Sequence, residues 1–201
     1  MYELPTSIKI LNEDYPIRNA GDYRVILDCF SALQDIELSE EERVIASLVI
    51  FYEDALYLDN NSINVFQLFD TEEKVLEAVK GMYNFFNCNG ESVGNKVNYR
   101  LIDWDKDSQM IASAVNKVAG TEIRSIDYLH WWTFMGDYGA VGESTLSTVV
   151  TIRQKIMRNK KLEKYENEFR HDNPQFFTWN SATVEQQEAD AWVQSLWDNN
   201  N

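Results

Sequence analysis

The stretch Tyr128-Leu129-His130-Trp131-Trp132-Thr133-Phe134-Met135 places four aromatic side chains and a histidine within eight residues. A helix that packs on one side buries a stripe roughly 100° wide, which cannot hold all of these side chains. Some of them must therefore face solvent or meet a second layer of the protein. One interpretation is a core anchored from two sides, with His130 hydrogen-bonded to a backbone carbonyl. The other is a binding surface, because Trp and Tyr dominate such sites.

Apolar residues recur at helical spacing on both sides of this stretch, and capping residues mark where the helices begin. The pattern predicts helices from Asp22 to Leu33, from the capping box of Ser39 and Glu42 to about Tyr57, from Asp70 with Glu73 to Phe86, from Asp105 to Ala119 with Gly120 at its end, and from Ser125 through the aromatic stretch. Gly136, Gly139 and Gly142 are predicted to interrupt the last of these helices.

Both ends of the chain add further elements. Alternation of apolar and polar residues from Ser7 to Ile17 predicts a short hairpin, in which Pro16 requires an edge strand. Helical periodicity restarts at Leu146 and extends through Phe169 toward a stop before Pro174. We therefore expect a mainly α protein, a compact bundle of about seven helices with an N-terminal β-hairpin. Its predicted parts are the hairpin at residues 1–20, a helical domain at 21–175 and a tail at 176–201, with a last helix from Thr183.

Composition limits the possible functions. The chain has 201 residues, of which 44% are hydrophobic, enough for a packed core. It carries 18 Lys and Arg against 33 Asp and Glu, a formal net charge of −15. Such a chain repels phosphate groups, so nucleic acids and anionic membranes are poor partners. No apolar run has the length of a membrane span, and no signal-peptide pattern is present. Cys29 is predicted as a reduced, buried thiol, which indicates a reducing cytoplasm.

The residues that support catalysis do not occur in the required patterns. His130 and His171 lie far apart in the sequence, and neither has a cysteine nearby, so zinc is not indicated. There is no G-x-S-x-G motif and no local cysteine-protease signature. We therefore expect no catalytic, cofactor-binding or metal-binding residues and no enzymatic activity. An enzyme with an acidic active site is the least favoured of the alternatives.

Six basic residues fall within twelve positions of this acidic chain. They are Arg153, Lys155, Arg158, Lys160, Lys161 and Lys164. The simplest interpretation is a solvated face of a long helix, partly neutralised by Glu163 and Glu166. The alternative is a docking patch for an acidic partner helix or for an acidic face of another copy of the chain.

Several segments together resemble a family of siphophage morphogenesis proteins named after gene product fifteen of a phage of Gram-positive hosts. The segments that carry the resemblance are Asp103-Trp104-Asp105-Lys106-Asp107, then Ile111, Ala112 and Ala114, then Gly120-Thr121-Glu122-Ile123, and Leu129 to Phe134. The similarity covers Ile8 to Phe169 in arrangement, and the Leu129 to Phe134 element is its most specific part. After Met135 the three glycines depart from the more continuous helix that the resemblance implies.

The resemblance implies a role in tail assembly, because the family is encoded between the major tail protein and the tape measure protein. It implies a chaperone that keeps the tape measure protein soluble in the host cytoplasm until the tail tube polymerises. The alternative is a structural virion subunit, such as a head–tail joining or tail-completion protein. Other tail proteins and further copies of the chain are possible partners. The candidate partner-binding residues are Tyr128, His130, Trp131, Trp132, Phe134, Arg153, Arg158, Lys160 and Lys161.

Overall fold

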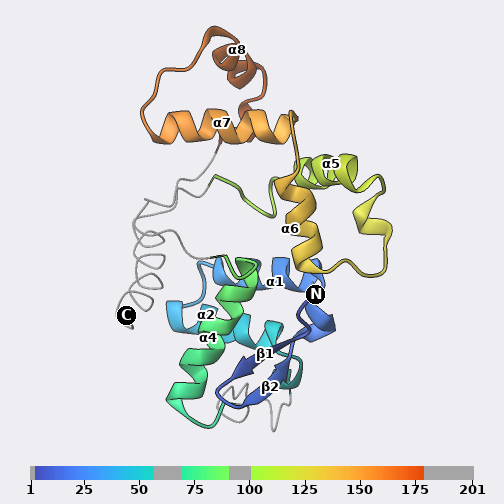
Figure 1. Cartoon of the computed structure of the whole chain (residues 1–201). Helices are drawn as coiled ribbons and strands as arrows, with labels where there is room; N and C mark the ends of the chain where they lie inside the picture. Colours follow the sequence, from blue (N-terminus) through green and yellow to red (C-terminus); the bar gives the residue numbers. More distant parts are fainter. Residues whose placement is uncertain (1–2, 57–68, 91–100, 179–201) are drawn as a thin grey trace. The chain divides into compact units, whose positions relative to one another are not determined.

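The computed structural model describes residues 3–56, 69–90 and 101–178, and they form seven α-helices and one two-stranded sheet (Figure 1). The prediction of a mainly α fold with an N-terminal hairpin is confirmed. The helix predicted from Thr183 lies outside the described residues. None of the helices described is long and apolar enough to cross a membrane.

The chain divides into two compact units. Unit 1 comprises Met1–Lys96 and Trp104–Gly142, and unit 2 comprises Val97–Asp103 and Glu143–Asn201. Unit 1 contains β1 (Ser7–Ile10), β2 (Glu13–Pro16), η1 (Arg18–Gly21), α1 (Tyr23–Leu33), α2 (Glu40–Phe51), η2 (Glu53–Leu56), α4 (Glu72–Phe86), α5 (Ser108–Ala119), η3 (Ile123–Ser125) and α6 (Trp131–Gly139). Unit 2 contains α7 (Thr145–Met157), α8 (Lys164–Asp172) and η4 (Pro174–Phe176).

The hairpin has the predicted position, and it packs against α4. β1 and β2 are antiparallel, with Ile8 opposite Tyr15. Gly81 of α4 makes this close approach possible, because a Cβ atom there would collide with Cγ2 of Ile8. The Tyr52 hydroxyl donates to the carbonyl of Ala78 at 2.8 Å, which fixes the end of α2 against the same helix.

Three of the predicted helix boundaries are confirmed by their capping bonds. The Asp22 carboxylate accepts from the backbone N–H of Arg24 at 3.0 Å, where α1 begins. Ser39 and Glu42 form the expected capping box of α2. Gly120 ends α5 with a left-handed φ of 71°. At α4 the N-cap is Thr71 instead of the predicted Asp70.

The prediction that the second helix continues to about Tyr57 is wrong, because α2 ends at Phe51. The guanidinium of Arg18 donates to the carbonyls of Val49, Ile50 and Tyr52 at distances of 2.9, 2.7 and 2.8 Å. Because Arg18 already donates to these carbonyls, they do not need the backbone N–H groups of a further helical turn as donors. The chain leaves the helix there and continues as the short η2.

The prediction of a helix starting at Ser125 is also wrong, because α6 begins at Trp131. Arg24 donates to the carbonyl of Ile126 at 2.6 Å, and the N–H of Leu129 donates to Asp22 at 2.9 Å. Backbone groups that a helix would use are thus bonded to the start of α1. The segment between η3 and α6 is held in a non-helical conformation.

The predicted interruption falls at Gly139 and Gly142, between α6 and α7, and not at Gly136. α6 continues through Gly136 and ends at Gly139. A Cβ atom added at either glycine would meet no atom of the described chain within 4 Å. The helix therefore exposes this face, and glycine is not required there for close packing.

The long helix predicted from Leu146 through Phe169 is two helices, α7 and α8. Asn159 has a left-handed φ of 50°, which Asn tolerates better than most residues and which ends α7. The carboxylate of Glu166 accepts from the N–H of Glu163 at 2.8 Å and starts α8. The predicted single basic helix face is therefore divided between a helix, a turn and a second helix.

Gly81 and Gly136 are both helical glycines, and their surroundings predict opposite effects of alanine. Gly81→Ala should lower the free energy of unfolding by about 1–3 kcal/mol, because the added methyl group collides with Ile8 of the hairpin. Gly136→Ala should raise it by about 0.5–1 kcal/mol, because helix propensity improves and nothing collides. Urea denaturation of both variants measures the effects. Equal shifts in the same direction would contradict the packing described here.

Candidate partner-binding surfaces

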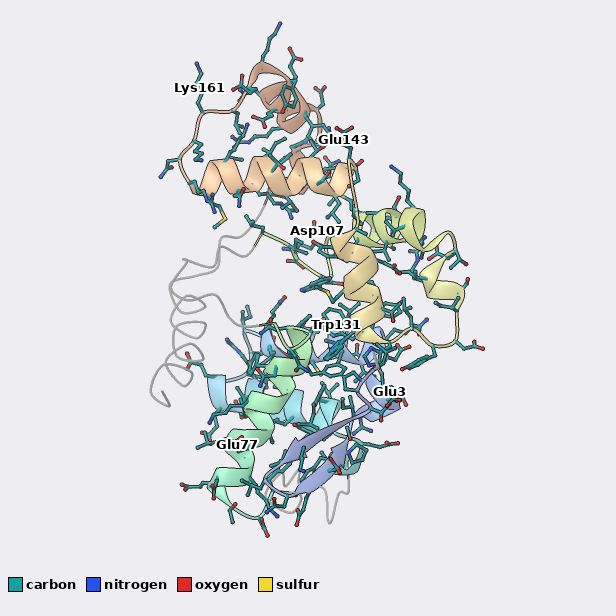
Figure 2. All side chains as sticks on the ribbon, viewed as in Figure 1. Glu3, Glu77, Asp107, Trp131, Glu143 and Lys161 are labelled. Atoms are coloured by element: carbon teal, nitrogen blue, oxygen red, sulfur yellow. The ribbon has the colours of Figure 1, made fainter. Side chains whose placement is uncertain are left out.

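The aromatic stretch joins the beginning of α6 to the end of α4. The indole Nε1 of Trp131 donates to the carbonyl of Phe86 at 2.9 Å, and that of Trp132 donates to the carbonyl of Phe85 at 2.9 Å. The last carbonyls of a helix have no partner within the helix, and burying them unpaired is costly. The two indoles therefore cap α4. Figure 2 shows Trp131 among the closely packed side chains of unit 1.

His130 connects this cap to the start of the chain. Its Nδ1 accepts a hydrogen bond from the N–H of Trp132 at 3.0 Å and so caps α6. The proton is therefore on Nε2, which lies 3.0 Å from the carbonyl of Pro5 and donates to it. The residue is 1% exposed. Burial lowers the pKa of His130, although the Pro5 carbonyl and the Asp22 carboxylate act in the opposite direction.

Rings from α1, from α6 and from the segment that precedes α5 surround Trp131 in the core of unit 1. Trp131 lies 5.4 Å from Phe134 between ring centroids, 5.6 Å from Phe30 of α1 and 5.9 Å from Trp104. Phe134 in turn stacks on Tyr23 at 4.9 Å. Trp131 and Phe134 are each 1% exposed. The interpretation of the stretch as a core anchored from two sides is confirmed for His130, Trp131 and Phe134.

Two aromatic residues of the stretch reach the surface. Tyr128 is 50% exposed, and its hydroxyl donates to the carbonyl of Ala20 at 3.1 Å. Trp132 is partly exposed and lies 5.8 Å from Phe85 between ring centroids. Beyond Trp132, α6 exposes Thr133 and Gly136. A partner that contacts the aromatic stretch directly would meet Tyr128 and the free edge of Trp132.

Two of the six clustered basic residues have structural roles within unit 2. The guanidinium of Arg153 donates to the carbonyl of Phe176 at 2.7 and 3.0 Å and to that of Leu101 at 3.0 Å, and the residue is 7% exposed. Lys155 forms an ion pair with Glu166 at 2.7 Å, and the Glu166 side chain is 1% exposed. The ammonium of Lys155 holds the pKa of Glu166 below its ordinary value.

The other basic candidates lie at the surface. Arg158, Lys160 and Lys161 are exposed in the turn that follows α7. Figure 2 shows Lys161 at the outer side of this turn. The structure therefore separates the nine candidate residues into a buried group, His130, Trp131, Phe134 and Arg153, and an accessible group, Tyr128, Trp132, Arg158, Lys160 and Lys161.

Sequence reasoning did not identify the arginines that position these surfaces. Arg24 holds the segment that carries Tyr128, through its bonds to the carbonyls of Ile123 and Ile126. Arg18 performs the same function at the end of α2. A lone arginine next to a helix start gives no sequence signal for this role, because its acceptors lie 31–103 residues away.

The electrostatic character of the two units differs strongly. The described residues of unit 1 contain 21 Asp and Glu against 9 Lys and Arg, a net charge of −12. Those of unit 2 contain 6 acidic and 7 basic residues, a net charge of +1. Among the described residues, no group of three or more His, Cys, Asp or Glu could hold a metal ion. Both cysteines are free, and burial raises the pKa of Cys29 to about 12, which keeps it a neutral thiol.

Comparison with known proteins gives one family. The family model described as bacteriophage Gp15 protein matches residues 1–174, which includes both surfaces. No curated protein matches the chain. No solved structure matches it either.

The capping role of Trp131 leads to a graded prediction. Trp131→Ala should lower the free energy of unfolding by about 3–5 kcal/mol, because it opens a cavity in the core. Trp131→Phe keeps a ring but leaves the Phe86 carbonyl without its donor, so we expect a loss of about 1–3 kcal/mol. Urea denaturation followed by circular dichroism measures both. A Trp131→Ala variant as stable as the unmodified chain would show that the indole does not hold the core.

The lowered pKa of His130 predicts that the stability of the fold depends on pH. Its pKa is lowered from 6.5 in the folded chain, so the unfolded chain binds the proton more tightly. This contribution to stability is complete above pH 6.5 and is lost as the pH falls toward the lower, folded pKa. His130→Asn retains an N-cap acceptor and removes the titration. The variant should therefore lose less stability than the unmodified chain between pH 7.5 and 5.5, measured by urea denaturation. Equal losses would contradict the role of His130.

Proposed function

The chain belongs to the bacteriophage Gp15 protein family, and on this basis we propose that it is a tail-assembly chaperone that binds the tape measure protein. The resemblance inferred from the segments between Asp103 and Phe134 is confirmed, and the family model matches residues 1–174, a longer region than Ile8 to Phe169. We place its action in the host cytoplasm, before the tail tube polymerises, and we assign it a binding role without catalysis. Family membership is the observation that carries this proposal.

The charge of unit 1 supports a solubilising role. A tape measure protein is a long helical client with an apolar surface that must not aggregate before assembly. Covering that surface with a protein of strong negative charge makes the complexes repel each other and stay dispersed. The net charge of −12 over the described part of unit 1 is suited to this task.

The exposed edge of the aromatic stretch is the client contact that we propose. An amphipathic helix binds by placing its apolar side against aromatic and aliphatic side chains. Tyr128 and Trp132 offer such area, and both are already held in place by bonds to backbone carbonyls. Little side-chain entropy would be lost on binding, because the rings are ordered in advance. The buried members of the stretch act by positioning these two.

Co-expression tests the proposal. The tape measure protein of the same phage, produced alone in bacteria, should be largely insoluble. Produced together with this chain, it should become soluble and co-purify with a tag placed on this chain. A tape measure protein that is equally soluble without this chain, or that never co-purifies, would refute the chaperone role.

A substitution at Tyr128 tests whether the client binds at the aromatic stretch. Tyr128→Ser should weaken co-purification about fivefold or more, the equivalent of about 1 kcal/mol. Leu76→Ser is the matched control. Leu76 is 43% exposed on α4, and its replacement by serine removes a similar apolar area elsewhere on unit 1. It should leave client binding unchanged. Equal effects of the two variants would contradict the assignment to the aromatic stretch.

Mass spectrometry of purified virions separates this role from that of a structural subunit. A chaperone is released when the tail tube forms and should be absent from virions. Stoichiometric amounts of the chain in virions would favour a head–tail joining or tail-completion protein instead.

A further inference from the structure

The turn from Arg158 to Lys164, here called the basic turn, has a defined conformation. On its α7 side, the N–H of Lys160 donates to the carbonyl of Lys155 at 2.8 Å. On its α8 side, the N–H of Glu163 donates to the Glu166 carboxylate at 2.8 Å. Both ends of the turn are thus anchored to helices, and its side chains are presented from a fixed backbone.

The cations of the basic turn have almost no partners within the described chain. Arg158, Lys160 and Lys161 are exposed, and none of them forms an ion pair with a described residue. Lys164 approaches Glu168 to 3.8 Å, with side chains 92% and 63% exposed. An exposed pair at that distance contributes little. The positive charge of the turn is therefore available to another molecule.

An exposed aromatic residue adjoins these cations. Tyr165 is 63% exposed at the start of α8, directly after Lys164. Its hydroxyl lies 3.4 Å from the Glu166 carboxylate, which limits the orientation of the ring. A tyrosine with cations around it has the composition of a binding site, an apolar anchor with a charged rim.

The chain also carries the complementary surface. Residues Asp35–Glu42, here called the acidic turn, comprise most of the connection between α1 and α2 and the first three residues of α2, and they hold five carboxylates and no basic residue. The Asp35 carboxylate accepts from the N–H of Glu37 at 2.9 Å, which orders the start of the turn. Ile36 lies between Asp35 and Glu37 in the sequence and is 76% exposed. The acidic turn thus also has an apolar anchor with a charged rim, of opposite sign.

We propose that the basic turn of one copy of this chain docks on the acidic turn of a second copy. The charges of the two turns are opposite, and Tyr165 and Ile36 supply apolar area to the same contact. Net charges of −12 and +1 over the described parts of units 1 and 2 bring unlike units of two copies together and keep the acidic units apart. Because the two surfaces differ, the contact either recurs head-to-tail in rings or filaments or occurs twice in a two-fold dimer. It does not require the client proposed above.

Sedimentation velocity of the purified full-length chain tests this inference. The chain is measured over a range of concentrations, in about 50 mM and about 500 mM salt, because the higher concentration screens exposed charges. Three double variants are compared with it: Lys160→Glu with Lys161→Glu, Glu40→Lys with Glu41→Lys, and the control Lys9→Glu with Arg170→Glu. The control cations are exposed, lie outside the basic turn and change the net charge by the same amount as the first variant. Circular dichroism confirms that each variant is folded.

The unmodified chain should assemble in low salt, with a mass that rises with concentration, and should dissociate in high salt. Each turn variant should weaken the association at least about tenfold, whereas the control should not. An equimolar mixture of the two turn variants should form a one-to-one complex, because the first variant retains the acidic turn and the second retains the basic turn.

A chain that is monomeric at every concentration in low salt would overturn the proposal, and so would turn variants that assemble like the unmodified chain. Association that both variants lose but their mixture does not recover would exclude head-to-tail contact. All of these measurements are made without the tape measure protein, so their failure and a failure of the chaperone proposal are distinguishable.

Discussion

The need to satisfy the backbone groups at helix ends governs the structure of unit 1. The last carbonyls of α4 are buried, and the indoles of Trp131 and Trp132 are their donors. These indoles stand at the start of α6, whose first turn is capped by His130. Because the N–H of Tyr23 donates to the carbonyl of Leu129 at 2.9 Å, α1 begins at the same place. The position of three helices therefore depends on one short aromatic segment.

Arginines extend the same principle to the rest of the chain. Arg18, Arg24 and Arg153 each donate to two or more backbone carbonyls where a helix or turn leaves groups unpaired. The guanidinium group is suited to this role because it carries five donors in a fixed geometry and keeps its charge when partly buried. These three cations therefore bind backbone carbonyls of the same chain. The basic turn is different, because its cations remain exposed.

This division separates structural residues from residues that are available to partners. His130, Trp131, Phe134 and Arg153 hold backbone and core, whereas Tyr128, Trp132 and the basic turn are accessible. A change in the first group would alter binding by disturbing the fold, and a change in the second group would alter it directly. The proposed chaperone role uses the exposed aromatic residues Tyr128 and Trp132. The proposed self-association uses the basic turn and the acidic turn.

The sequence by itself determined the elements whose signals are local. The hairpin, the Asp22 and Ser39 caps and the stop at Gly120 depend on residues within a few positions of each other, and all are found in the structure. The family resemblance also came from local motifs. Tertiary structure decided the end of α2 and the start of α6, whereas the break between α7 and α8 rests on the local conformation of Asn159 and the local bond between Glu163 and Glu166. The physical reason at the first two is that a distant partner takes up the backbone groups a helix would have used: Arg18 lies 31 residues or more from its acceptors, and Arg24 about a hundred. Tertiary structure likewise decided which aromatic and basic residues are buried, because that depends on which helix ends are brought together and not on the spacing of residues along the chain.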